Sequence, residues 1–238
     1  MKSLGFVVLA CAAACAGHPE AVATAPTQAP AAAAPSVDAQ DAGLATADVD
    51  AGAPAPAPAP APRPAPRIIL HAGDSMVGGN GGLAQALDAR FKPLGSKYVR
   101  DWRVATVQTF DYRNYFGALL EKHHPDMVIL CLGANDVFVP SPKVLARFVT
   151  SIARKASANG RPCYWITPPL WKPPDTGIVE VIKQNATGCK VFDSSNLKLP
   201  RWNDGIHPTN QGGVLWAEKF WAFYQADAEA EAPGVVPR

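Results

Sequence analysis

The sequence predicts an α/β fold in which a parallel five-stranded sheet is covered by helices on both faces. Apolar runs of strand length alternate with helical patterns along residues 67–226. The run Met127–Leu132 is apolar throughout, which is typical of a central strand buried on both faces. All 6 Trp and all 5 Tyr of the 238-residue chain lie in this segment. Its length suits one domain with a substantial core and excludes two.

The strand candidates are short apolar runs that end at turn-forming residues. The first stops at Gly73, and the fourth stops at Pro168-Pro169, because Pro cannot continue a central strand. The five candidates are Ile68–Ala72, Lys97–Val107, Asp126–Leu132, Cys163–Thr167 and Lys190–Phe192.

Helical patterns separate these strands. The clearest begins at Ser141-Pro142, where a capping residue precedes a Pro at the first helical position, and it closes at Asn159-Gly160. Apolar residues also repeat at helical spacing over about residues 80–93 and 209–225. The expected helices cover about residues 80–93, 113–123, 141–159, 176–186 and 209–225.

The first 15 residues have the features of an export signal. Lys2 gives a positive start, and the apolar run Ser3–Ala10 is too short to span a bilayer. The small residues before Cys11 and Cys15 resemble the lipobox of bacterial lipoproteins, in which a Cys is acylated. Cys15 is the favoured lipidation site, since cleavage at Cys11 leaves a very short apolar region. An ordinary signal peptide with incidental cysteines is the alternative.

Residues 16–66 have the composition of a disordered stalk. They contain no Phe, Trp or Tyr and a single Leu, so they cannot bury enough apolar surface to offset their conformational entropy. Ala and Pro alternate from Ala53 to Arg67, a pattern that favours an extended polyproline II helix. Residues 227–238 are expected to form a flexible tail. We therefore expect an exported protein, lipid-anchored in the bacterial cell envelope and facing the periplasm or the cell surface.

Charge and cysteine content limit the partners. The net charge is +2 and the basic residues are scattered, which argues against a nucleic-acid partner. Cys163 and Cys189 each begin a strand-like run, and an exported protein permits a disulfide between them. Cys131 is expected to be a buried thiol, and no cysteine spacing indicates zinc. The sequence indicates no oligomeric state.

Two of three polar motifs directly follow predicted strands. Gly73-Asp74-Ser75 follows the first strand, where a Ser hydroxyl can stand above the sheet edge. Gly133-Ala-Asn135-Asp136 follows the central strand, and its Asn can donate hydrogen bonds to the same space. Taken alone, a Gly-Asp-Ser triplet is more often a turn with a Ser cap, and an Asn-Asp pair is commonly a helix cap or an Asx turn.

The third motif, Asp204-Gly-Ile-His207, precedes the last helix. Its spacing lets the carboxylate reach one imidazole nitrogen while the other nitrogen faces outward. A single Asp and His in this arrangement are more often structural. All three motifs, however, are expected at one rim of the sheet, where the functional sites of α/β proteins usually lie.

The order of the three motifs resembles the SGNH (GDSL-type) hydrolase superfamily over residues 68–225. The resemblance implies a flavodoxin-like three-layer αβα sandwich and ester hydrolysis with neither metal nor cofactor. It assigns the nucleophile to Ser75, the base to His207 and the orienting carboxylate to Asp204. The oxyanion donors would be the Asn135 side chain and the Ser75 N–H. The supporting motif residues are Gly73, Asp74, Gly133 and Asp136.

One block departs from the family pattern. The family usually has a Gly after the second strand, whose N–H completes the oxyanion hole. No Gly occurs between Gly95 and Gly117 here. A backbone N–H needs no Gly, so Ala105 or Thr106 could serve.

The expected function is a serine ester hydrolase for small acyl esters, such as O-acetyl groups on envelope or extracellular polysaccharide. Aromatic residues near the predicted rim suit sugar rings, or else anchor the rim loops. The alternatives are an O-acyltransferase with the same triad, a non-catalytic polysaccharide-binding lipoprotein, and a metal-dependent phosphoesterase. His71 is expected to be a packed strand residue. The aromatic residues are Tyr112, Tyr115, Phe138, Trp171 and Trp202, and the phosphoesterase would use Asp74, Asp136, Asp204 and His207.

Overall fold

The computed structural model describes residues 64–78, 82–172 and 175–231. The predicted signal segment with Cys11 and Cys15, residues 16–63 of the predicted stalk and residues 232–238 of the predicted tail lie outside the described residues. Among the helices of the described ranges, none has both the length and the apolar character needed to cross a membrane.

Five parallel strands form one sheet in the order β2–β1–β3–β4–β5. The chain moves outward from β1 to β2 and then returns to β3, so the winding direction reverses between β1 and β3. Ligands bind at such switch points, beyond the carboxyl ends of the strands. The predicted flavodoxin-like α/β class is confirmed. The strands are β1 (Ile68–Gly73), β2 (Lys97–Trp102), β3 (Met127–Cys131), β4 (Cys163–Ile166) and β5 (Lys190–Phe192).

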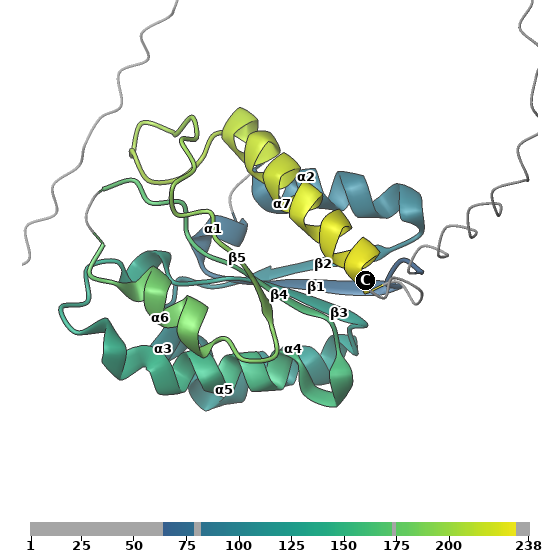
Figure 1. The fold of residues 1–238 in the computed structure, drawn as a ribbon, viewed down its shortest axis with the longest axis horizontal. Helices are drawn as coiled ribbons and strands as arrows, with labels where there is room; N and C mark the ends of the chain where they lie inside the picture. The colour runs from purple at the N-terminus through teal and green to yellow at the C-terminus, as the bar shows by residue number, and fades with distance from the viewer. Residues whose placement is uncertain (1–63, 79–81, 173–174, 232–238) are drawn as a thin grey trace, which may run out of the picture. The chain divides into compact units, whose positions relative to one another are not determined.

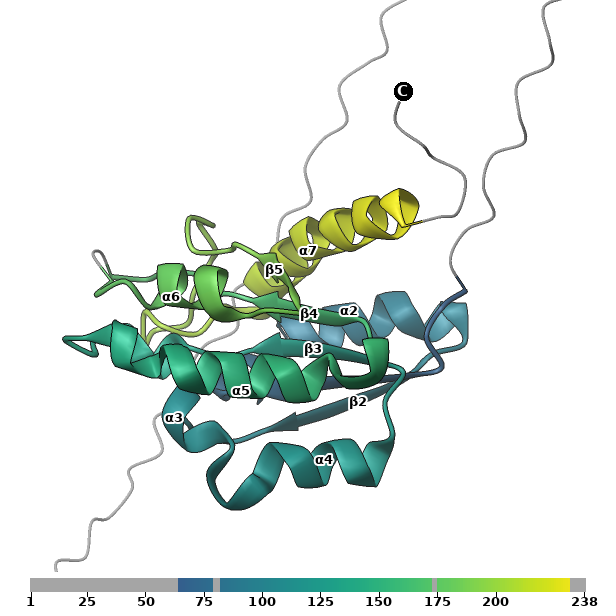
Figure 2. The ribbon, with the colours of Figure 1, turned by 60° about the horizontal axis from the view of Figure 1, so that its bottom comes forward.

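Helices cover both faces of the sheet (Figures 1 and 2). α2 (Leu83–Phe91) and α7 (Asn210–Ala230) lie on one face. The other face carries α3 (Val107–Phe110), α4 (Tyr115–His123), α5 (Ala146–Ala156) and α6 (Ile178–Asn185). The four-residue helix α1 (Ser75–Gly78) follows β1 directly.

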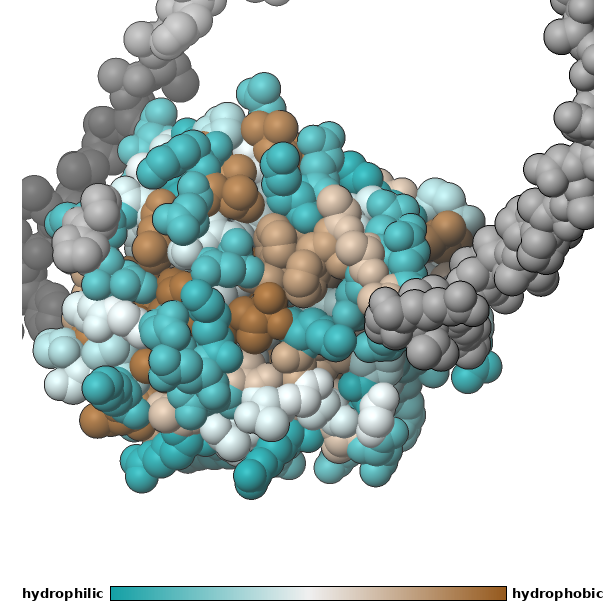
Figure 3. Space-filling view, viewed as in Figure 1, coloured by the Kyte–Doolittle hydropathy of each residue, from teal (hydrophilic) through white to brown (hydrophobic). Residues whose placement is uncertain are grey.

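Two hydrophobic cores explain the apolar strands. Along β1, Ile69 packs into the core beneath α2 and α7, whereas Leu70 packs into the core beneath α4, α5 and α6. In β3, Ile129 and Leu130 divide in the same way. A strand between two helical layers must be apolar on both sides, which is why β3 reads as a continuous apolar run. On the face drawn in Figure 3, apolar patches alternate with hydrophilic side chains.

Several element boundaries differ from the sequence expectation. The helix expected over residues 141–159 is α-helical only over Ala146–Ala156, between the short 3₁₀ turns Pro142–Leu145 and Ala158–Gly160. β2 ends at Trp102 instead of Val107, because Thr106 caps α3 in a reciprocal capping box with Thr109. The predicted tail was placed too early, since α7 continues to Ala230. Asp227 holds this extension: its carboxylate accepts a hydrogen bond from the Tyr164 hydroxyl at 2.7 Å and lies 2.9 Å from Lys190 Nζ.

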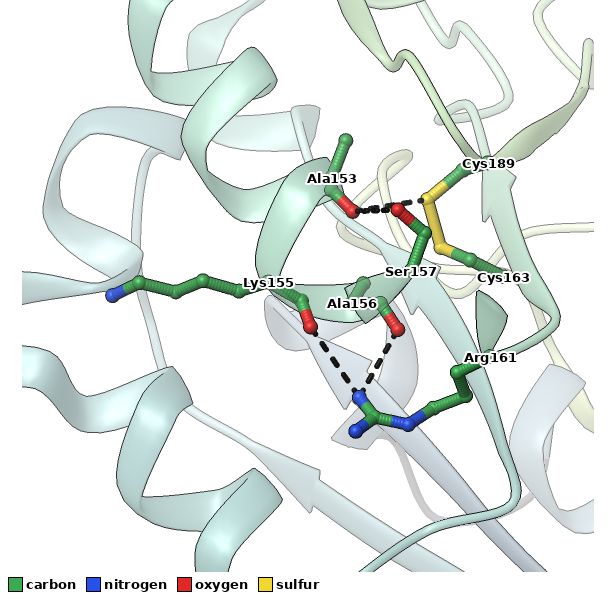
Figure 4. The surroundings of a disulfide bond; sticks show 7 residues. All are labelled: Ala153, Lys155, Ala156, Ser157, Arg161, Cys163 and Cys189. Carbon is green, nitrogen blue, oxygen red and sulfur yellow. Dashed lines mark hydrogen bonds between the residues drawn. A yellow bond between two sulfur atoms is a disulfide. The ribbon is translucent and has the colours of Figure 1, made fainter. Parts of the chain in front are cut away.

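A disulfide joins Cys163 at the start of β4 to Cys189 just before β5 (Figure 4). The C-terminal end of α5 lies beside it and is capped by two side chains. Ser157 Oγ donates to the Ala153 carbonyl at 2.9 Å, and the Arg161 guanidinium donates to two further carbonyls of the last turn. Cys131 is a buried free thiol, as expected.

His71 is a fully buried residue of β1, as the sequence predicts. Its Nδ1 lies 2.7 Å from the Tyr98 hydroxyl, and Nε2 is buried without a hydrogen-bond partner among the described residues. Burial, helped by the charge of Arg100, lowers the pKa of His71 to about 3. His71 is therefore neutral in the folded protein at neutral pH.

We expect the disulfide to contribute about 3 kcal/mol to the free energy of unfolding, because it closes a loop of 26 residues in the unfolded chain. The double variant Cys163→Ala/Cys189→Ala should lose this amount in denaturant titrations of the oxidised proteins. A reducing agent should destabilise the wild type to the same level and leave the double variant unchanged. Equal stability of the two oxidised proteins would contradict the prediction.

We expect His71 to make the fold acid-sensitive. As the pH falls from about 6.5 toward 3, an unfolded His gains a proton that the buried His71 does not, so the free energy of unfolding decreases. Between pH 7 and pH 4 the loss amounts to about 3 kcal/mol. Denaturant titrations at both pH values should show this loss in the wild type but not in His71→Gln. The carboxyl groups titrate in both proteins, so the same pH dependence in both would refute a role for His71.

Candidate active site

Ser75 is the first residue of α1, two residues beyond the end of β1. The preceding turn needs a glycine, because a Cβ on Gly73 would lie 1.8 Å from the carbonyl oxygen of Cys131. This close approach brings β1 against β3, and the Asp74 N–H donates to the same carbonyl at 3.0 Å. The turn thus places Ser75 at the carboxyl end of β1, at the switch point of the sheet.

Asp74 joins the Ser75 turn to the loop after β3. Its buried carboxylate accepts hydrogen bonds from the N–H groups of Gly133 and Ala134 through Oδ2, at 3.1 and 3.0 Å. Oδ1 accepts a bond from the N–H of Met76 at 3.0 Å. Burial raises the pKa of Asp74 to about 6, against the opposing effect of these three bonds. The carboxylate therefore holds the two loops in one arrangement.

Asp204 and His207 lie in a hairpin directly before α7. An antiparallel bridge between Arg201 and Pro208 closes the hairpin, and the Trp202 N–H donates to the His207 carbonyl at 2.9 Å. Within it, Asp204 Oδ1 accepts hydrogen bonds from the N–H groups of Ile206 and His207, at 2.8 and 2.9 Å. The short spacing of the motif is thus part of a turn that the carboxylate itself organises.

Ser75, His207 and Asp204 form a continuous hydrogen-bonded series. His207 Nε2 lies 2.9 Å from Ser75 Oγ, and His207 Nδ1 lies 2.8 Å from Asp204 Oδ2. The bond to His207, together with the two backbone bonds, lowers the pKa of Asp204 to about 2. An ionised carboxylate only accepts hydrogen bonds, so Nδ1 carries the proton and Nε2 is free to accept one from the Ser75 hydroxyl.

Asn135 faces the loop that follows β2. Its Nδ2 donates to the Ala105 carbonyl at 2.8 Å, which uses one of the two amide hydrogens. The two candidates for a further backbone donor differ. The Thr106 N–H donates to Thr109 Oγ1 at 3.0 Å, whereas the Ala105 N–H has no hydrogen bond within the described residues. The geometry therefore favours Ala105 over Thr106.

Asp136 holds the same loop from its other side. Its Oδ2 accepts a hydrogen bond from the Val107 N–H at 2.9 Å, and burial raises the pKa of the carboxyl to about 6. The adjacent side chains of Asn135 and Asp136 thus form hydrogen bonds with the backbone of Ala105 and of Val107, the residues on either side of Thr106.

The residues considered for a metal site do not form one. Asp74 and Asp136 bind backbone N–H groups, while Asp204 binds His207. In the part of the chain that the structure describes, no three His, Cys, Asp or Glu side chains are grouped as metal ligands.

The predicted rim aromatics divide into exposed and packed side chains. Trp202 is 52% exposed and lies in the hairpin of His207, and Tyr112 and Phe138 are also exposed. Trp171 is half-buried and packs edge-on against Phe138, with ring centroids 6.3 Å apart. The half-buried Tyr115 donates its hydroxyl hydrogen to Asp101.

Arg201 is not among the residues predicted from the sequence, but its guanidinium donates to backbone carbonyls of the His207 hairpin and of the loop after β4. The sequence carries no signal for these contacts, because all the acceptors are main-chain carbonyls.

Comparisons with known proteins bear on the family and on the fold. The family described as "GDSL-like Lipase/Acylhydrolase family" matches residues 71–213. The structure titled "Crystal Structure of TesA" is similar, with a TM-score of 0.55, 24% identity, and coverage of 67% of this chain and 99% of that chain. A member of the lipolytic protein G-D-S-L family from Veillonella parvula has a TM-score of 0.53 and 17% identity, with 66% and 98% covered. No curated protein matches the chain.

These two structures share the fold. The family match extends from β1 into α7 and includes every residue of the Ser75–His207–Asp204 series. The chain belongs to the GDSL-like lipase/acylhydrolase (SGNH hydrolase) family.

Proposed function

We propose that this protein is a serine ester hydrolase with Ser75 as nucleophile, His207 as general base and Asp204 as the carboxylate that orients the imidazole. The observation that carries the proposal is the continuous series of hydrogen bonds from Asp204 through His207 to Ser75. A nucleophile within hydrogen-bond reach of a base, itself oriented by a third group, is the arrangement that covalent acyl transfer requires.

The reaction follows from these positions. His207 Nε2 takes the Ser75 proton as Oγ attacks the ester carbonyl, and the imidazolium is stabilised by Asp204. The C–O bond then breaks, the alcohol leaves with the proton from His207, and the acyl group stays on Ser75. Water, deprotonated by His207, attacks the acyl-enzyme and releases the carboxylic acid and free Ser75.

The tetrahedral oxyanion would be stabilised by the second amide hydrogen of Asn135 and the backbone N–H groups of Ser75 and Ala105. Removing one donor of this kind costs about 2.7–4 kcal/mol of transition-state stabilisation in comparable sites. The Ala105 N–H then takes the position that the family usually gives to a glycine.

We propose small acyl groups on a glycan as the substrate class, O-acetyl esters being the simplest case. The exposed Trp202 ring, in the hairpin that carries His207, supports this choice because aromatic faces suit sugar rings. A lipid anchor at Cys15, or at Cys11, and the Ala/Pro-rich stalk would hold the domain at the cell envelope. At about 3.1 Å per residue, an extended stalk would place the site tens of ångströms from the membrane.

Replacing Ser75 with Ala should abolish hydrolysis of p-nitrophenyl acetate and butyrate and leave the fold intact, because the nucleophile is lost without a change in the core. Chelator should have no effect on the wild type. Ser157→Ala is the matched control, since Ser157 Oγ donates to a helix carbonyl beside the disulfide.

Acyl transfer to an added sugar acceptor in preference to water would identify a transferase. A folded wild type without turnover and without fluorophosphonate labelling of Ser75 would support the non-catalytic alternative.

Replacing Asp204 with Asn should lower kcat by about 10⁴-fold, by analogy with serine-protease triads. The Asn amide would donate to Nδ1 and leave a proton on Nε2, where it cannot accept from Ser75. The matched control is Asp126→Asn, because the Asp126 carboxylate accepts a hydrogen bond from the Ile68 N–H at the opposite end of β1 from Ser75. Steady-state kinetics of the two variants and the wild type make the comparison. Unchanged kcat in Asp204→Asn would remove Asp204 from the mechanism.

A further inference from the structure

We propose that Arg201 is a positioning residue for the Asp204–His207 pair, acting through the peptide group between Ile206 and His207. The inference rests on the proposed function, because it deepens the role of the same site. Neither a sequence motif nor the family match singles out this arginine.

The Arg201 guanidinium joins two loops at the rim of the sheet. One terminal nitrogen donates to the Ile206 carbonyl in the hairpin of His207. The other donates to the carbonyls of Pro169 and Leu170, at 3.0 and 3.2 Å, in the loop after β4. The planar fork of an arginine can serve several acceptors in fixed directions, whereas a lysine offers one flexible ammonium group.

The contact with Ile206 bears directly on His207. The Ile206 carbonyl and the His207 N–H belong to one planar peptide group. Arg201 binds the carbonyl side of this group, and Asp204 Oδ1 accepts the N–H at 2.9 Å. The peptide that leads into His207 is therefore held from both sides, which sets the direction in which its imidazole leaves the backbone.

The loop after β4, to which Arg201 joins the hairpin, is itself held in place. The loop after β4 is bound to the loop after β5, since the Leu170 N–H donates to the Ser195 carbonyl at 3.1 Å. The hairpin itself is open to solvent, with Trp202, Asn203 and Asp204 all exposed. Arg201 thus connects an exposed catalytic hairpin to an ordered part of the rim.

Replacing Arg201 with Ala should lower kcat for p-nitrophenyl acetate by about 100-fold, the scale of a misplacement of about 1 Å. KM should change by less than about threefold, because the clamp lies behind the imidazole and does not bind substrate. Millimolar guanidinium should restore part of kcat by occupying the vacated position. Arg201→Lys, which keeps the charge and much of the stem, should show a smaller loss and serves if the Ala variant does not fold.

Arg161 offers a matched control. It too is a half-buried arginine that donates to two backbone carbonyls, those of Lys155 and Ala156, but it caps α5 beside the disulfide (Figure 4). Arg161→Ala should lower the midpoint of thermal unfolding and leave kcat unchanged, without rescue by guanidinium. A kcat in Arg201→Ala within about twofold of the wild type would overturn the proposal. The proposal would also be overturned if kcat fell in both variants only in proportion to the fraction of each protein that is folded.

A second measurement does not need turnover. Nitrogen chemical shifts of His207 in ¹⁵N-labelled protein should show the Nδ1–H tautomer in the wild type and in Arg161→Ala, and a mixture of tautomers in Arg201→Ala. The same tautomer in all three proteins would refute the positioning role. If the wild type hydrolyses no ester while Arg201→Ala shifts the tautomer, the proposed function fails and the positioning role remains.

Discussion

The geometry of the rim depends on one buried carboxylate, that of Asp74. Its three hydrogen bonds to backbone N–H groups join the end of β1, where Ser75 begins α1, to the loop after β3, which carries Asn135. Burial penalises the charge and raises the pKa of Asp74 to about 6. The three amide hydrogen bonds oppose this increase, and the carboxylate is therefore still ionised at neutral pH. A neutral side chain of the same shape would bind those donors less strongly. The charge therefore serves the arrangement of the loops and not the chemistry directly.

The two cores place this rim on a rigid base. β3 is apolar on both sides, and β1 is apolar apart from the buried His71, so a shift in register of either strand would move the polar residues at its ends toward a core. The end of each strand then has a defined position, and the residues that follow start from it. The His207 hairpin has less of this support: it comes from the largely exposed segment before α7, and its Ile206 is only partly buried against the core beneath α2 and α7. It is positioned by hydrogen bonds of side chains to backbone, which is why polar contacts there matter more than packing.

The five strands, the longer helices between them and the meeting of three motifs at one rim were predictable from the sequence, because apolar period and strand-end position are local signals. The end of β2 was not predictable, because the sequence after Trp102 has the composition of an extended strand. In the structure, the capping box of Thr106 and Thr109 begins a helix there. The length of α7 was not predictable either, because Asp227 is held by Tyr164 and Lys190, which are distant in sequence. Arg201 was missed for the same reason: its acceptors are main-chain carbonyls, which have no sequence signature.

The absence of a glycine after β2 has a structural counterpart in the Asn135-Asp136 pair. A glycine at such a position lets the substrate and the backbone approach each other closely, but it has no side chain that could fix the position of the loop. Here the side chain of Asn135 binds the Ala105 carbonyl and that of Asp136 binds the Val107 N–H, while Thr106 closes the capping box between them. Three consecutive residues are thus fixed by side chains, and the Ala105 N–H is held in place without the need for an unusual backbone conformation. The position of the loop after β2 is set by directed hydrogen bonds from the loop after β3, and the same loop binds Asp74 of the Ser75 turn, so both segments share one anchor.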